Sequence, residues 1–177
     1  MAVQAFVDES RRNDTYYLAA AVVELKDLGR LRTGVRGLLL PGQRELHFKK
    51  EKASRRKLIL SRLTAFGVRV DIYRAACGAG EEQARQRCLA RLVDDLLDLG
   101  GGRLVLDSRD DRDRFDLLTI RTALGKQARA SHLMYEHSES GLEPLLWIPD
   151  IVVGCHGLGG DWTRRTNPVI GSVVRLD

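Results

Sequence analysis

Apolar and polar residues alternate along this chain with two periods, one typical of strands and one typical of helices. Residues 3–9 and 15–24 are rich in β-branched and aromatic side chains, and the polar link at 11–14 predicts that these two strands form a hairpin. Further strands are predicted over 45–48, 68–75, 103–107 and 132–137. Helical spacing covers 28–39, 54–66, 81–99, 108–129 and 145–155. This alternation predicts an α/β fold with a mixed central β-sheet flanked by helices.

Serine, glycine and proline residues mark the predicted ends of several helices. Ser54 and Ser108 are predicted N-caps, and Gly67 is predicted to end the helix that follows Ser54. Pro149 is placed near the start of the final helix, where it is tolerated. The glycine-rich sequence GLGGDW at 157–162 has neither the P-loop spacing nor a GxGxxG arrangement after a strand, so we predict a turn there.

Composition predicts one soluble domain. The 177 residues contain no linker and no internal repeat, which favours a single domain over residues 1–177. The hydrophobic fraction of 44% and the charged fraction of 30% are those of soluble globular proteins. The longest apolar stretch, 16–23, is too short to cross a membrane, and Asp8 and Glu9 interrupt any signal peptide. We therefore expect no membrane association and a cytoplasmic location.

The cysteines and serines give little support for nucleophilic catalysis. Cys77, Cys88 and Cys155 are an odd set without CxxC spacing, which predicts buried thiols in place of a disulfide framework or a zinc knuckle. No serine has the context of a nucleophile elbow, and Cys155 and His156 are only neighbours in sequence.

Four acidic residues stand beside apolar segments. Asp8, Glu45, Asp107 and Asp150 occur in the sequences AFVDES, RELHF, RLVLDS and LLWIPDIVVG. An acid that closes an apolar strand lies at the rim of the sheet, where distant parts of the chain meet. Carboxylates gathered there repel one another and raise their pKa values unless a divalent cation offsets the charge. We therefore predict that these residues converge on Mg²⁺ or Mn²⁺.

Each acid also has an ordinary structural role open to it. Asp8 can cap a turn toward Arg11 and Arg12, and Asp107 can cap the following helix. Asp150 is the one charge in an eight-residue hydrophobic segment, so it needs a metal, a hydrogen bond or a salt bridge to an arginine. That isolation makes Asp150 the strongest single-residue signal.

Other acids near these positions are predicted to lie elsewhere. Glu9 points to the opposite face of the first strand from Asp8, so only one of the two can join the cluster. Acidic residues alternate with arginines after Asp107, a pattern typical of a solvated helix face. The residues placed on that solvated face are Asp110, Asp111, Asp113 and Asp116.

Glu45 and His47 are two residues apart on a predicted strand, so their side chains share one face. A carboxylate suits a hard cation, and a neighbouring imidazole can move protons near neutral pH. We count His47 with the catalytic candidates, and an ordinary surface pair is an equally good interpretation.

Positive charge is concentrated directly after this pair. The net charge is +5 and the pI about 9.4, which permits a nucleic-acid partner without establishing one. Cations at the start of a helix oppose its dipole, so an anion such as phosphate would stabilise them there. A solvated basic face is the alternative. The predicted contacts to the nucleic-acid backbone are Lys49, Lys50, Lys52, Arg55, Arg56 and Lys57.

The order of these motifs resembles that of a known family. The sequence AFVDES followed by YYLAAAVVE, ELHF, RLVLDS and LLWIPDIVVG is similar to the uncharacterised bacterial family labelled domain of unknown function 3800. This resemblance implies a ribonuclease H-like fold in which acids of the first strand, a later strand and the final helix bind divalent cations. It places Asp8, Asp107 and Asp150 at those positions, and Glu45 at the ELH element of the family.

Our leading hypothesis is a metal-dependent phosphodiester hydrolase that acts on nucleic acid. In it, two cations about 4 Å apart activate water and stabilise the leaving oxygen. The alternative is a non-catalytic module on the same fold that binds nucleic acid or a protein, with its acids satisfied by arginines. Hydrolysis of a small phosphorylated substrate is a third hypothesis and requires a deep closed pocket.

Overall fold

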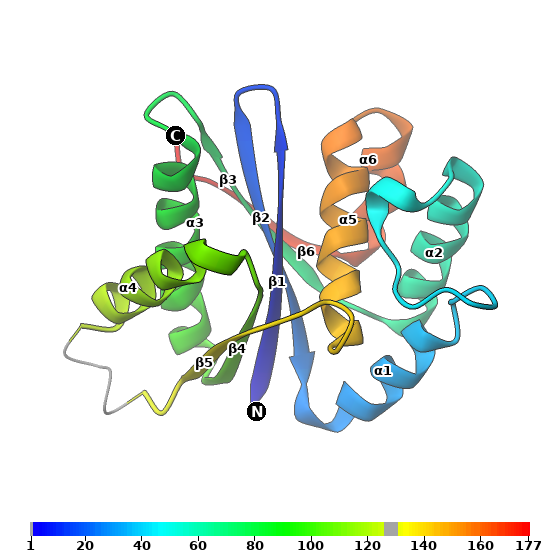
Figure 1. Cartoon of the computed structure of the whole chain (residues 1–177), viewed down its shortest axis with the longest axis horizontal. Coiled ribbons are helices and arrows are strands. Elements are labelled where there is room, and N and C mark those ends of the chain that lie inside the picture. Colours follow the sequence, from blue (N-terminus) through cyan, green and yellow to red (C-terminus); the bar gives the residue numbers. More distant parts are fainter. Residues whose placement is uncertain (1, 126–130) are drawn as a thin grey trace.

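The computed structural model of the protein describes residues 2–125 and 131–177. Its centre is a six-stranded sheet in the order β5-β4-β1-β2-β3-β6 (Figure 1). The strands are β1 (Val3–Arg12), β2 (Thr15–Glu24), β3 (Val70–Ala76), β4 (Gly101–Asp107), β5 (Met134–Ser138) and β6 (Ile170–Arg175).

The sheet is mixed, and its register determines where the strand ends lie. β1, β2 and β3 form an antiparallel meander, β4 and β5 run parallel to β1, and β6 runs parallel to β3. The pairing of β1 with β4 ends at Val7 and Leu106. Asp8 and Asp107 therefore follow directly where these two neighbouring strands separate.

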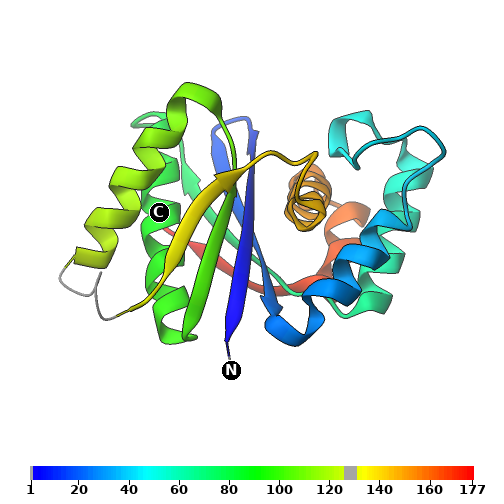
Figure 2. The same cartoon turned by 60° about the horizontal axis from the view of Figure 1, so that its bottom comes forward.

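Helices cover both faces of the sheet (Figures 1 and 2). α3 and α4 lie on one face, whereas α5 lies on the other with α1, α2 and α6 on the same side. The helices are α1 (Leu28–Arg36), α2 (Ala53–Phe66), α3 (Glu81–Asp98), α4 (Asp113–Leu124), α5 (Trp147–Leu158) and α6 (Asp161–Thr166). Short 3-10 helices cover Leu25–Asp27, Phe48–Lys50, Asp110–Arg112, Pro144–Leu146 and Asn167–Val169.

The alternation of side chains along β1 divides the core into two. Phe6 belongs to the core on the α5 side, together with Val105 of β4. Ala5 and Val7 point the other way, into the core beneath α3. The predicted α/β fold with a mixed sheet and flanking helices is confirmed.

The prediction of a strand over 45–48 is wrong. Leu46 and Phe48 are buried while Glu45 and His47 are partly exposed, which imitates the period of a strand. The segment pairs with no strand of the described chain. His47 is the N-cap of the 3-10 helix Phe48–Lys50, and the amide of Phe48 donates to the carboxylate of Asp150 at 2.8 Å. A tertiary contact therefore satisfies the backbone here.

The sequence did not predict β6 or α6. The segment predicted as a turn at 157–162 has positive φ at Gly159 and Gly160 and then enters α6 at Asp161. β6 completes the edge beside β3, where Ile72 pairs with Val173. Its residues are mostly exposed, so they lack the apolar pattern of a central strand.

Two predicted helix caps are also wrong. α2 begins at Ala53 after Lys52, so Ser54 lies inside the first turn. α4 begins at Asp113 after a 3-10 helix, and the hydroxyl of Ser108 donates to the Asp113 carboxylate at 2.6 Å. The structure ends α4 at Leu124, and residues 126–130 of the predicted helix lie outside the described residues.

Within the described ranges, no helix is both long and apolar enough to span a membrane. The three cysteines are free and buried, as predicted. Gly67 ends α2 in the left-handed conformation, with φ of 72°, and this prediction is confirmed.

Candidate metal centre

Two of the predicted ligands lie side by side on the sheet. Asp8 is two residues beyond Phe6 on β1, and Asp107 is two residues beyond Val105 on β4. Because side chains alternate along a strand, both carboxylates point to the face that α5 covers. Glu9 points to the opposite face, as predicted from the same alternation.

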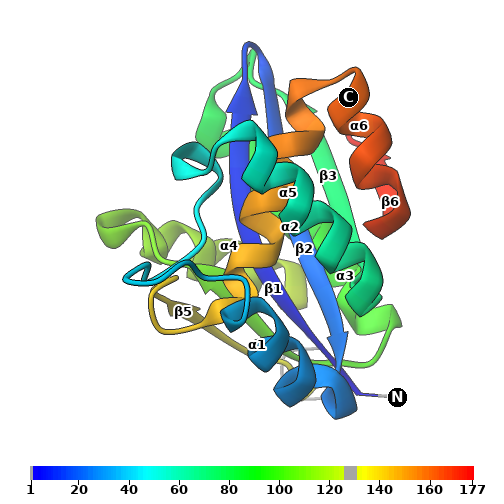
Figure 3. The ribbon, with the colours of Figure 1, turned by 90° about the vertical axis from the view of Figure 1, so that its right-hand side faces the viewer.

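α5 lies over this face of the sheet (Figure 3), and it contributes Asp150. Its carboxylate accepts the Phe48 amide at 2.8 Å, and the Nδ1 atom of His47 lies 3.7 Å from the same oxygen. Gly154, one turn further along α5, makes this approach possible. A Cβ atom there would lie 2.2 Å from the Phe48 ring, so only glycine lets the loop pack this closely.

Glu45 is held by the segment before α5. The hydroxyl of Ser140 donates to Glu45 Oε2 at 2.9 Å, and the indole of Trp147 donates to the Ser140 carbonyl at 2.7 Å. Glu45 lies on the loop between α1 and α2. These hydrogen bonds hold the loop to partners about a hundred residues away in sequence.

The charge of each of these acids affects the pKa of its neighbours. Burial, then the charges of Asp150 and Asp107, raise the pKa of Asp8 well above its ordinary value. Burial, then Asp150 and Glu45, raise the pKa of Asp107 to about 6. Burial also raises the pKa of Asp150, although the Phe48 amide and His47 oppose the shift. Each ionised carboxylate therefore makes ionisation of its neighbours harder.

None of these four acids has an arginine partner within 4.0 Å in the part of the chain that the structure describes. Asp8 does not reach Arg11 or Arg12, and it accepts the amide of Glu9 at 2.7 Å. Asp150 accepts a backbone amide in place of the salt bridge that was its structural alternative. No arginine of the described chain therefore offsets the negative charge of this cluster.

A second cluster on the opposite face is neutralised. Asp116 is 1% exposed, so its predicted place on a solvated face is wrong. Its oxygens accept from Arg85 at 2.8 and 2.9 Å and from Arg109 at 2.8 Å, and one oxygen lies 2.9 Å from His137 Nε2. Although burial raises the pKa of Asp116, the bonds from His137 and Arg85 hold it below its ordinary value.

The potential ligand atoms of this second cluster lie close together, but its arginines make it less suited to a cation. Within the described residues, only Asp113, Asp116 and His137 bring three potential ligand atoms within 4.8 Å of one another. Two guanidinium groups already bind Asp116, and a divalent cation would have to displace or face them. We therefore assign the arginine-bound cluster a structural role.

The basic segment after His47 divides into engaged and free side chains. Arg55 donates to the Leu38 carbonyl at 2.6 Å. Arg56 donates to the Phe48 carbonyl at 2.7 Å and stacks over the Phe48 ring at 3.8 Å. Lys57 lies 6.0 Å from the ring of Trp162. Exposed positions are occupied by Lys49, Lys50, Lys52 and Lys57, and a nucleic-acid contact by this segment stays a prediction.

Comparison with known proteins gives the fold. No family model matches the chain, and no curated protein matches it. A chain in the structure of the PCNA:RNase HII complex from Archaeoglobus fulgidus is 18% identical with a TM-score of 0.57, over 85% of this chain and 70% of that one. This chain has a ribonuclease H-like fold. RNase H1 from Halobacterium salinarum NRC-1 is 13% identical with a TM-score of 0.35, over 81% of this chain and 92% of that one.

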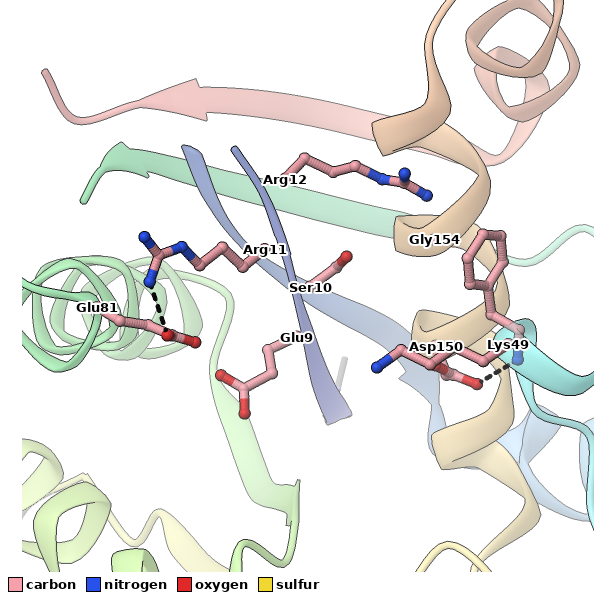
Figure 4. A pocket seen from close by; sticks show the side chains of 9 residues that line it. Glu9, Ser10, Arg11, Arg12, Lys49, Glu81, Asp150 and Gly154 are labelled. Atoms are coloured by element: carbon pink, nitrogen blue, oxygen red, sulfur yellow. Dashed lines mark hydrogen bonds and ion pairs between the residues drawn. The ribbon is translucent and has the colours of Figure 1, made fainter. Parts of the chain in front are cut away.

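Two of the four acids of this ribonuclease H-like chain line cavities. One cavity of about 460 Å³ adjoins Asp150, and both Arg12 and Lys49 line it (Figure 4). The other, of about 680 Å³, adjoins Glu45 and is lined by Lys50. Arg12 could not be recognised from the sequence as a cavity residue, because it is one basic residue in a predicted turn.

Proposed function

We propose that the protein is a divalent-metal-dependent phosphodiester hydrolase that acts on nucleic acid. One contrast within the molecule carries the proposal. The acids on the α5 face raise one another's pKa and have no arginine partner among the described residues, whereas Asp116 on the other face is bound by two arginines. Arginines neutralise the buried carboxylate of Asp116. The acids on the α5 face lack such partners, so they are available to bind cations.

In this proposal Asp8, Asp107 and Asp150 hold the cations, and Glu45 completes the ligand set. Mg²⁺ or Mn²⁺ bound there would activate water and stabilise the leaving oxygen. His47 accepts the Lys49 amide at its Nδ1 atom, at 3.3 Å, so the neutral ring has its proton on Nε2. In this proposal, that nitrogen exchanges a proton with the substrate or water.

Three of these carboxylates do not meet closely enough, as they stand, to hold a single cation. No three of these acids bring ligand atoms within 4.8 Å of one another. Oxygens on opposite sides of one Mg²⁺ are about 4 Å apart, since each bond is roughly 2.1 Å. Two cations about 4 Å apart extend the reach of a ligand set to roughly 8 Å. We therefore propose two cations in place of one, which requires the four acids to lie within that reach.

We also propose, from the order of its motifs, that the chain belongs to the family labelled domain of unknown function 3800. We propose that residues 1–177 form one domain. We propose nucleic acid as the substrate because exposed lysines lie beside the acids and because the similar RNase HII structure belongs to a ribonuclease. A cytoplasmic location completes the proposal.

Calorimetry and a nuclease assay on the same preparations test the proposed function. We expect wild type to bind Mn²⁺ or Mg²⁺ and to cleave RNA or DNA, and we expect Asp8→Asn to lose cleavage and most of the binding. Asp161→Asn is the matched control, because Asp161 is an exposed acid paired with Arg164 and Arg165. Absence of metal binding by wild type would sink the enzymatic hypothesis and leave the non-catalytic module.

A further inference from the structure

The cavity beside Asp150 is lined by five charged side chains in addition to Asp150 itself. It lies between the end of β1 and the loop before α2, and Ser10 and Gly154 form part of its wall (Figure 4). Three basic and three acidic side chains line it: Arg11, Arg12, Lys49, Glu9, Glu81 and Asp150. Their pairing decides which charge is left for a ligand.

Two of the acids are already matched by arginines. Arg11 turns away from the cavity centre and pairs with Glu81 at 3.1 Å. Glu9 is 2.7 Å from the buried guanidinium of Arg85 and accepts a hydrogen bond from the Tyr16 hydroxyl. Neither acid is therefore available to neutralise another cation in this cavity.

Arg12 and Lys49 keep their positive charge. In the described chain, neither has a carboxylate within 4.0 Å. The stem of Arg12 lies against Gly157 of α5, since a Cβ there would be 3.2 Å from Arg12 Cγ. Lys49 points across the cavity, and it lines the same cavity as Asp150 of the proposed metal centre. Two side chains that keep their positive charge therefore line the same cavity.

We propose that Arg12 and Lys49 bind a phosphate of the nucleic-acid backbone next to the one that is cleaved. This deepens the proposed function and rests on it for the identity of the polymer. A guanidinium and an ammonium that line one cavity favour a group with several anionic oxygens, such as a phosphate. Asp150 lines the same cavity and repels such an anion; the charges of Arg12 and Lys49 offset that repulsion, and a cation at the metal centre would offset it further.

Binding of a fluorescent single-stranded oligonucleotide tests the site without relying on cleavage. The measurement uses EDTA and the Asp8→Asn background, so that the probe stays intact, over salt from about 50 to 200 mM. Each lost phosphate contact lowers the slope of log K against log salt by about 0.7 for single strands. We expect that loss for Arg12→Gln and for Lys49→Gln.

Charge-matched controls separate this site from general attraction. Lys26→Gln removes a lysine that pairs with Glu24, and Arg91→Gln removes an arginine that pairs with Asp95 on α3. Both should leave the slope unchanged. Unchanged slopes in the Arg12 and Lys49 variants, or equal losses in the controls, would overturn the proposal. Full competition by inorganic phosphate at millimolar concentration would also overturn it, because the site would then hold a free anion.

The two proposals fail in different ways. If the Arg12 and Lys49 variants lose slope but wild type with Mg²⁺ cleaves nothing, the phosphate site stands and the hydrolase assignment fails. If wild type cleaves nucleic acid but both variants keep the slope of wild type, the hydrolase assignment stands and the phosphate site fails.

Discussion

At the scale of single residues, the chain uses aspartate in two electrostatic states. Asp107 has few compensating contacts and a pKa raised to about 6 by burial and by Asp150 and Glu45. Asp116 is more deeply buried, yet its pKa is lowered because His137, Arg85 and Arg109 surround it. Burial alone therefore does not determine the ionisation of an aspartate here; its partners do.

Asp107→Asn should stabilise the protein at neutral pH and do nothing at low pH. The pKa of this carboxyl is higher in the folded protein than in the unfolded chain. Its contribution therefore lowers the free energy of unfolding as pH rises from about 4 to about 6, because the unfolded chain ionises there more readily. We expect a gain on the order of 1 kcal/mol above pH 7, discounted for solvent screening, that disappears below pH about 4.

Thermal unfolding of both proteins between pH 4 and 8, with EDTA present, measures this difference. Asp161→Asn should show no such gain, because its arginine partners lower the pKa of that carboxyl. A gain that is constant across the pH range would contradict the raised pKa of Asp107.

At the scale of elements, the position of the loop before α2 depends on one glycine in α5. Gly154 lets the Phe48 ring lie against the helix, and this contact brings the Phe48 amide to Asp150. His47 and Lys49 flank Phe48, so the same contact positions the imidazole and the ammonium beside the acids. Helix packing and site geometry are therefore coupled here.

Gly154→Ala should destabilise the protein by about 1–3 kcal/mol, the usual cost of overpacking a core. A new Cβ would meet the Phe48 ring at 2.2 Å, so the loop must move away from Asp150. Urea unfolding gives the stability change, and any metal-dependent activity should fall with it. Gly29→Ala in α1 is the control, since nothing lies within 4 Å of its Cβ position and alanine favours helix. Equal effects of the two substitutions would contradict this role for Gly154.

At the scale of the whole molecule, one ionic network joins elements across the α3 face. Arg85 of α3 contacts Asp116 of α4, Glu9 of β1 and the hydroxyl of Tyr16 on β2. Arg109, just after β4, joins the same carboxylate. The network thereby ties together the two strands that present Asp8 and Asp107 on their other side.

Asp116→Ala should cost about 3–5 kcal/mol in unfolding free energy, because it leaves Arg85 buried without its main partner. Asp161→Ala, which removes an exposed ion pair, should leave the unfolding free energy nearly unchanged. Denaturant unfolding measures both, and a double-mutant cycle with Arg85→Met isolates the pair. A small loss for Asp116→Ala would show that solvent reaches this network.

The sequence by itself determined the elements whose residues alternate in polarity. β1, β2 and β4 follow from local patterns of apolar side chains, and the same alternation placed Asp8 and Glu9 on opposite faces. The mixed α/β sheet followed from the order of strands and helices. These features are local because a strand or helix repeats its environment every two to four residues.

Only the tertiary structure decided what the polar residues contact. The loop over 45–48 imitates a strand because its burial alternates, yet its amide goes to Asp150, 102 residues away in sequence. Asp116 looks solvated among alternating charges, and Arg85 of another helix buries it. The difference is physical: an apolar side chain needs only to leave water, whereas a buried charge needs particular partners, and folding brings these from distant parts of the chain.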